Sequence, residues 1–209
     1  MIASPAPLVL LDYAGVLIFS ATGALAAARN RYDLVTFAFF AAVTGIGGGT
    51  LRDLLLGAPV FWVHDGGYLV ACVIAAVVVW LVGPRPRLFG ALLWLDALRL
   101  AAYAVVGAAK AAGLGAPPIV CIAMGALTAS FGGVIRDVLA GEPSVLLRRE
   151  ITISAALLAA SLFVLLRWAG VDDLIAAAAG FVAGFALRSG ALLFGWSLPA
   201  FRSRAAPPQ

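Results

Sequence analysis

The residues best suited to handling ions lie in two copies of one motif, Gly-Gly-x-x-Arg-Asp. The first copy ends the segment TGIGGGTLRD, Thr44 to Asp53, and the second ends TASFGGVIRD, Thr128 to Asp137. Clustered glycines weaken a helix, and carbonyl groups that they expose can replace part of a cation's hydration shell. Small residues also let helices pack closely, which one cluster alone would favour. Two equivalent clusters, each followed by a charge pair, favour a pore or a substrate path.

The predicted pore-lining positions in these segments carry hydroxyl groups or no side chain. They are Thr44, Gly47, Gly48, Gly49, Thr128, Ser130, Gly132 and Gly133. The second cluster begins with Phe131 where the first begins with Gly47, so the two halves of the pore need not be equivalent.

Charged residues inside apolar segments are the second chemical signal, because a charge that faces lipid is costly. The predicted pore charges are Asp12, Arg52, Asp53, Asp96, Lys110, Arg136 and Asp137, and Arg99 is a further intramembrane charge. Two interpretations stay open: pairs that only neutralise each other, or a polar lining that holds water and selects ions. In the second interpretation, we expect Asp53 and Asp137 to supply the field that attracts cations.

Lys110 is the only lysine of the chain and lies toward the end of an apolar segment. Its ammonium group could extend to the membrane interface. It could instead act as a gate or a voltage-sensing charge at the mouth of a pore.

The segments that must position these residues are apolar and long enough to cross a bilayer. The chain is 64% hydrophobic and 11% charged, with a mean hydropathy of +1.08, whereas soluble domains are about half apolar and a quarter charged. Lipid must therefore be the solvent for most of the surface. The sequence predicts an all-α integral membrane protein, a single membrane domain over 1–209, with a tail at 195–209. The expected spans are 8–28, 34–57, 66–83, 89–112, 118–141, 151–168 and 173–194.

The first six spans form a repeat with a shift of 84 residues, the separation of Asp12 and Asp96 (96 − 12). The same shift superimposes both Gly-Gly-x-x-Arg-Asp motifs without a gap. Each repeat, 8–83 and 89–168, holds three spans, an odd number, so the second copy enters the membrane from the opposite side. Such 3+3 inverted repeats are common in transporters. The seventh helix, 173–194, has no repeat partner, and its closely spaced glycines predict a packing role.

Depth along the spans predicts two symmetric ion pairs. At about 1.5 Å of rise per residue, Asp12 and Arg52 both fall ~9 Å from the midplane on one side. By the repeat, Asp96 and Arg136 share the same depth on the other side. We expect Asp12 to pair with Arg52 and Asp96 to pair with Arg136, with Arg99 close enough to share Asp96.

The distribution of arginine predicts the orientation. With the N-terminus outside, the outer connections hold only Arg167, and the C-terminus lies in the cytoplasm. The arginines then expected on the inner side are Arg29, Arg31, Arg85, Arg87, Arg148, Arg149, Arg188, Arg202 and Arg204.

Several function classes have no support in the sequence. Cys72 and Cys121 both lie inside apolar runs, and a single histidine, His64, cannot form a metal cluster. No nucleophile–base pair, metal-ligand spacing or nucleotide-binding loop is recognisable, and no basic cluster suggests nucleic acid. We therefore expect no enzymatic activity, no metal and no cofactor.

Two glycine-rich spans that end in Arg-Asp, within 3+3 inverted spans and a seventh helix, resemble the trimeric intracellular cation (TRIC) channel family. The resemblance runs from Asp12 to the seventh span. It implies a homotrimer in which each protomer has its own pore, lined by the two glycine-kinked helices, the second and the fifth, and permeable to K⁺ and other monovalent cations. The chain resembles prokaryotic members, which implies the inner (plasma) membrane of a prokaryote. The Lys-Glu-Val motif of the animal proteins is absent, so regulation that depends on it is not expected.

A second function stays open, because bacterial relatives of this family are also described as presumptive glycine transporters. Broken helices suit a secondary transporter of a small amino acid such as glycine, since helix N-termini attract carboxylates. A channel must keep a continuous wet path open and a carrier must never do so. The sequence alone does not separate these two functions.

Overall fold

The computed structural model describes residues 6–84, 86–142 and 151–198, and this part of the chain forms seven α-helices and one short 3₁₀ helix. The helices are α1 (Ala6–Arg29), α2 (Leu34–Leu55), η1 (Phe61–Val63), α3 (Gly67–Val82), α4 (Pro86–Gly113), α5 (Pro118–Leu139), α6 (Thr152–Trp168) and α7 (Asp173–Phe194). The seven predicted spans are confirmed, each within a few residues. The predicted tail lies outside the described residues from 199 onward.

The ends of the helices follow from local side-chain chemistry. Asp33 caps α2 by accepting a hydrogen bond from the backbone amide of Thr36 at 2.8 Å, and this bond lowers the pKa of the Asp33 carboxyl. The helices α2 and α5 both end before a glycine with positive φ, Gly57 (+63°) and Gly141 (+67°). Only glycine adopts this conformation at low cost. The two repeat-equivalent helices are therefore terminated in the same way.

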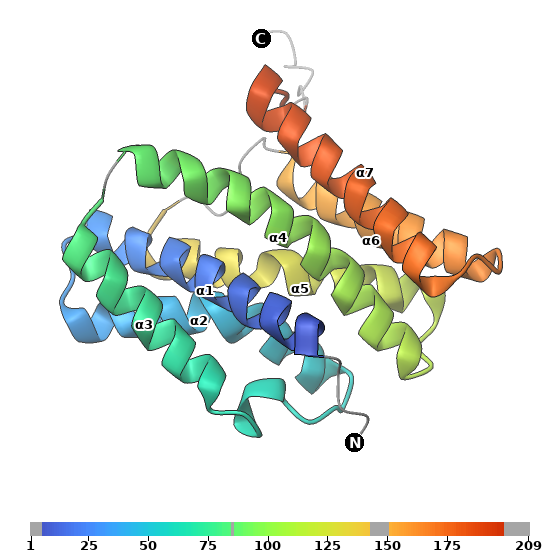
Figure 1. The fold of residues 1–209 in the computed structure, drawn as a ribbon, viewed down its shortest axis with the longest axis horizontal. Helices are drawn as coiled ribbons and strands as arrows, with labels where there is room; N and C mark the ends of the chain where they lie inside the picture. Colours follow the sequence, from blue (N-terminus) through green and yellow to red (C-terminus); the bar gives the residue numbers. More distant parts are fainter. Residues whose placement is uncertain (1–5, 85, 143–150, 199–209) are drawn as a thin grey trace, which may run out of the picture.

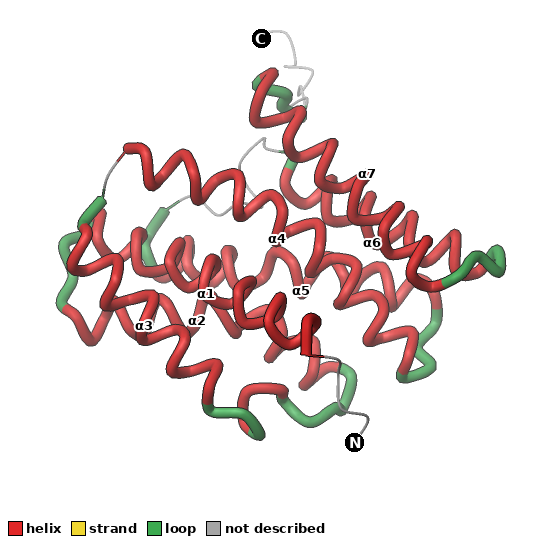
Figure 2. The backbone as a smooth tube through the Cα atoms, in the orientation of Figure 1, coloured by secondary structure: helices red, strands yellow, loops and turns green. Residues whose placement is uncertain are grey.

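The outer surface is apolar, as expected for a protein whose solvent is lipid. By length and composition α2, α5, α7 and residues 90–113 of α4 could cross a membrane, and α3 and α6 are shorter apolar helices of 16 and 17 residues. The outward face of α3 exposes Val70, Val73, Ile74, Val78 and Leu81. All elements in Figure 2 are helices or short loops.

The helices form two three-helix units with matching contacts. In the first, α1, α2 and α3 pack on one another, and in the second, α4, α5 and α6 do the same. The two units meet mainly where α2 contacts α5, and α7 packs on α4 and α6. Figure 1 shows α1 to α3 on one side of the molecule and α6 with α7 on the other, with α4 extending between them. This arrangement matches the predicted inverted repeat plus a seventh helix.

The helices α2 and α5 touch backbone to backbone at two equivalent glycines. A Cβ added to Gly48 would collide with the carbonyl oxygen of Thr128, and one added to Gly132 would collide with the carbonyl oxygen of Thr44. The repeat relates these two contacts to each other. Both helices remain helical throughout these segments, so the glycines bring the two helices together at their centre.

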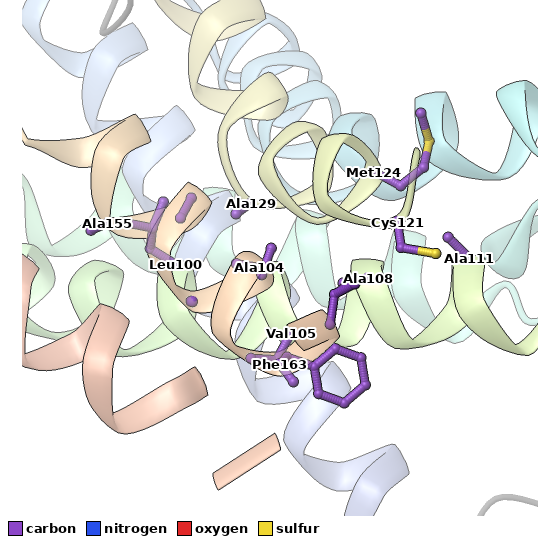
Figure 3. Packing of buried hydrophobic residues seen from close by; sticks show 14 of the residues in the cluster. Leu100, Ala104, Val105, Ala108, Ala111, Cys121, Met124, Ala129, Ala155 and Phe163 are labelled. Carbon is purple, nitrogen blue, oxygen red and sulfur yellow. The ribbon is translucent and has the colours of Figure 1, made fainter. Parts of the chain in front are cut away.

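Small side chains fill the core of the second unit. Figure 3 shows Val105 next to Phe163, in the cluster where α4, α5 and α6 meet, and the same cluster holds Ala104, Ala108 and Ala155. The seventh helix joins it through Gly180, where an added Cβ would lie 2.6 Å from the carbonyl oxygen of Ala159. The packing role predicted for α7 is confirmed.

The α2–α5 contact predicts different effects for neighbouring glycines of one motif. Gly48→Ala and Gly132→Ala should each destabilise the protein by about 1–3 kcal/mol, because a backbone carbonyl cannot move aside cheaply. Gly47→Ala should be neutral or stabilising, since its Cβ would lie 3.4 Å from Cδ1 of Ile135 and alanine favours helix. Thermal unfolding in detergent measures all three variants. Equal melting temperatures would show that the two helices are not in tight contact there.

Candidate functional site

A cavity of about 680 Å³ lies between α1, α2 and α4, and we call it the vestibule. Its wall includes residues from the first half of α1 (Asp12 to Phe19), the second half of α2 (Gly45 to Arg52) and the second half of α4 (Leu98 to Lys110). These halves point to the same face of the membrane, the face at which α1 begins. The vestibule therefore extends from that face to about the middle of the helices. Thr128, near the middle of α5, contributes to its deep end.

The structure places some of the predicted site residues on the vestibule wall and the others away from it. Those that line the vestibule are Asp12, Gly48, Gly49, Arg52, Lys110 and Thr128. The others lie elsewhere in the described structure: Thr44, Gly47, Asp53, Asp96, Ser130, Gly132, Gly133, Arg136 and Asp137. The vestibule wall thus comes mainly from the first motif, and the second motif lies beyond its deep end.

The hydroxyl groups of the two motifs mostly bond to their own helices. Thr128 donates to the carbonyl oxygen of Met124 and Ser130 to that of Ala126, both at 2.6 Å. Thr44 is fully buried, and its Oγ1 has no hydrogen-bond partner among the described residues. Of these three residues, only Thr128 lines the vestibule.

A buried carboxylate lies behind the vestibule wall and is bound by two cationic side chains that line it. Asp53 has no exposed surface and accepts hydrogen bonds from Nε of Arg52 at 2.8 Å and from Nζ of Lys110 at 2.7 Å. The backbone amide of Phe61 donates to its other oxygen at 3.2 Å. Lys110 therefore points to Asp53, and the expectation that it extends to the interface is wrong.

The second motif repeats the arginine–aspartate contact on the other side of the membrane. Arg136 binds Oδ1 of Asp137 through both Nε (2.9 Å) and Nη2 (2.8 Å), and its Nη1 donates to Oγ1 of Thr22 at 3.1 Å. The repeat position of Lys110 is Ala26 (110 − 84). The first repeat therefore lacks the positive charge that Lys110 adds to the second repeat.

The two predicted ion pairs are wrong. Asp12 does not pair with Arg52 but accepts hydrogen bonds from the hydroxyl groups of Tyr68 and Tyr103, both at 2.7 Å. Each arginine of the motifs pairs instead with the aspartate that follows it. Depth was the reason for the prediction, and depth does not specify which way a side chain points around its helix.

The second predicted pair, Asp96 with Arg136, is not formed either. Asp96 instead contacts Arg99, which we expected only to share it. Arg99 Nε lies 3.2 Å from Oδ1 of Asp96, one helical turn away, and Arg99 Nη2 donates to the carbonyl oxygen of Ala129 at 2.9 Å. Arg99 is only 3% exposed. A buried charge needs such partners to be tolerated.

Sequence reasoning missed the tyrosines around Asp12. The rings of Tyr13 and Tyr68 are stacked with centroids 4.2 Å apart, and the Tyr13 hydroxyl donates to Asp65 at 2.7 Å. A phenol in an apolar span needs a polar partner, so Tyr68 and Tyr103 were themselves a signal. What they could not indicate was the partner, because both lie far from Asp12 in the sequence.

Comparison with known proteins agrees with the repeat and the fold. The family model described as "Glycine transporter" matches residues 9–84 and again 93–168, two halves that are also 84 residues apart (93 − 9). Among curated proteins, a UPF0126 membrane protein of Vibrio cholerae is 35% identical over 93% of this chain and 82% of its own length. The UPF0126 inner membrane protein YadS of Escherichia coli K12 is 36% identical over 71% of this chain and 73% of its own.

Solved structures of TRIC channels share the whole fold. The TRIC trimeric intracellular cation channel orthologue from Rhodobacter sphaeroides is 48% identical, with a TM-score of 0.84 over 92% of this chain and 100% of that one. A second TRIC cation channel is 29% identical, with a TM-score of 0.85 over 94% and 98%. These matches confirm the resemblance seen in the motifs. Because the matched proteins are channels, they also agree with the expectation that the protein is not an enzyme. On its two motifs, its seven helices and these matches, the chain belongs to the prokaryotic TRIC channel family, whose bacterial members are also called UPF0126 membrane proteins.

Proposed function

We propose that this protein is a channel for monovalent cations, chiefly K⁺, with a separate path in each protomer. The path runs through the vestibule and then past the second motif to the opposite face of the membrane. The observation that carries the proposal is a cavity that reaches mid-membrane between charged side chains, in a fold shared with TRIC cation channels. Intramembrane charges that face a cavity mark ion pathways.

The charges of the vestibule suggest how the path is controlled. Asp53 is fully occupied by Arg52 and Lys110, so it does not supply the free cation-attracting field that we expected from it. Asp12, bonded only to neutral hydroxyls among the described residues, is better placed to attract cations. We infer that Lys110 acts as a gate. Its side chain is 33% exposed, and if it swung away from Asp53, the carboxylate of Asp53 would still be paired with Arg52.

Assembly and location follow from the relatives as proposals for this chain. The Rhodobacter sphaeroides orthologue is described as trimeric and the Escherichia coli relative as an inner membrane protein. We propose a homotrimer in the inner membrane of a bacterium, to be tested by native mass spectrometry. A monomer or dimer in several detergents would contradict it.

The orientation, with the N-terminus outside and the C-terminus in the cytoplasm, remains a proposal. Of the arginines on which it rests, Arg85, Arg148, Arg149, Arg202 and Arg204 lie outside the described residues. In a background without Cys72 and Cys121, a cysteine added at the C-terminus should react with an impermeant maleimide in inverted vesicles and not in intact cells. Labelling in intact cells would show that the C-terminus lies outside and would contradict the proposed orientation.

A carrier for a small amino acid such as glycine is the second candidate. The matching family model is described as a glycine transporter, and a cavity that ends at mid-membrane is what alternating access requires. Asp12 and Lys110, both on the vestibule wall, could bind the ammonium and carboxylate groups of a zwitterion.

Flux into liposomes separates the two functions. Vesicles that contain the purified protein and are loaded with K⁺ should release K⁺ down its gradient without any amino acid. The rate of release should keep rising with K⁺ concentration, whereas the rate of a carrier saturates. The matched assay is exchange of radiolabelled glycine across the same vesicles. Saturable glycine exchange with no K⁺ release would favour the carrier and overturn the channel.

The Lys110 gate predicts a gain of cation flux on removal of its charge. Lys110→Ala should raise K⁺ conductance several-fold, because a fixed positive charge leaves a low-dielectric path while Asp53 keeps Arg52 as its partner. Lys110→Arg keeps the charge and serves as the control. Conductance and reversal potential in a KCl gradient measure both variants. An unchanged or lower cation conductance in Lys110→Ala would show that Lys110 is not a gate.

A further inference from the structure

A buried cationic side chain lies at the deep end of the vestibule. Arg99, near the middle of α4, lines the vestibule, and its guanidinium carbon lies 3.3 Å from the centroid of the Phe19 ring. The same group bonds to the carboxylate of Asp96 and to the backbone carbonyl of Ala129. The guanidinium thus joins α4 to α1 and α5 at mid-membrane.

The inverted repeat shows what this arginine adds. The equivalent of Arg99 is Gly15 (99 − 84), and the equivalent of Phe19 is Tyr103 (103 − 84). A Cβ added to Gly15 would collide with the Tyr103 ring, so in the first repeat the aromatic ring packs directly on the bare helix. In the second repeat, a guanidinium lies between the equivalent ring and α4. One of two symmetric positions therefore carries an extra cation.

The three partners of this guanidinium are groups that a permeating cation would use. Backbone carbonyls and carboxylates replace the water around an ion in selectivity sites, and the face of an aromatic ring attracts cations. Here all three kinds of group converge on one charged side chain. The oxygen atoms of Asp96 and Ala129 are held at 3.2 Å and 2.9 Å from its nitrogens.

We propose that Arg99 is a tethered cation that occupies a mid-membrane site for K⁺ and so closes the path in this conformation. The proposal rests on the proposed channel function and deepens it. The site consists of the Asp96 carboxylate, the Ala129 carbonyl oxygen and the Phe19 ring. It becomes available to K⁺ when the Arg99 side chain leaves.

The far side of this closure is built from the second motif. The Phe19 ring lies against Gly132, where an added Cβ would be 2.7 Å from Cε1 of the ring. One helical turn further along α1, Thr22 accepts the hydrogen bond from Arg136. Thr22 therefore lies beyond the stacked pair as seen from the vestibule, and Ile18, which lines the vestibule, lies before it.

The first measurement is K⁺ flux through the Arg99→Ala variant in liposomes. Flux should rise roughly tenfold or more, because a positive charge leaves the narrowest, least hydrated part of the path. Arg167→Ala is the matched control, since Arg167 is also paired with an aspartate, Asp173 at 3.1 Å, but lies on α6 and does not line the vestibule. Arg99→Met, which keeps the length but not the charge, replaces Arg99→Ala if that variant does not fold.

The second measurement is the access of a cationic thiol reagent from the vestibule side, in protein without Cys72 and Cys121. An Ile18→Cys variant should react whether or not Arg99 is present. A Thr22→Cys variant should be protected while Arg99 is present and should react when Arg99→Ala is added. A role of Arg99 in stability alone would change melting temperature without changing this pattern.

The two measurements separate the failure of this proposal from the failure of the channel. K⁺ flux in the unaltered protein that does not rise in Arg99→Ala, with Thr22→Cys protected in both, overturns the Arg99 closure and leaves the channel standing. Absence of K⁺ flux in every variant, with Thr22→Cys exposed only in Arg99→Ala, overturns the channel and keeps the closure. Absence of both effects overturns both.

Discussion

The close approach of α2 and α5 is the constraint on which the rest of the structure depends. Each helix places a glycine against the carbonyl oxygen of the other's threonine, Gly48 against Thr128 and Gly132 against Thr44. Close backbone contact of this kind requires small residues in membrane proteins, where no hydrophobic force draws helices together. Because the two helices enter from opposite sides, the crossing puts Asp53 and Asp137 at opposite ends of one central pair, and the other helices pack around it.

The two repeats share their backbone contacts and differ in the side chains along the proposed path. Gly23 and Gly107 both lie where an added Cβ would come within 2.5 Å of the threonine hydroxyl of the neighbouring helix. In contrast, Lys110 replaces Ala26 and Arg99 replaces Gly15. Packing therefore preserves the symmetry, while two extra cations in the second repeat make the molecule asymmetric. Both of these added cations line the vestibule.

The sequence was sufficient for the helices, the repeat and the family, and insufficient for the contacts of the charges. Helix positions follow from hydropathy and turn residues, and a shift of 84 residues follows from two short motifs, so both could be predicted. The Asp12–Arg52 pair could not be judged from depth, because the direction of a side chain around its helix depends on packing. The arginine of each motif turns to the adjacent aspartate, and Asp12 is satisfied by Tyr68 and Tyr103, which are distant in the sequence.

We propose that ions cross each protomer by a continuous path between the two repeats, which only a channel provides. Single-channel recording in planar bilayers under a KCl gradient tests this claim most directly. We expect discrete current steps whose reversal potential lies toward the K⁺ equilibrium potential. Steps that reverse toward the Cl⁻ equilibrium potential, or no steps from protein shown to be folded and inserted, would contradict it.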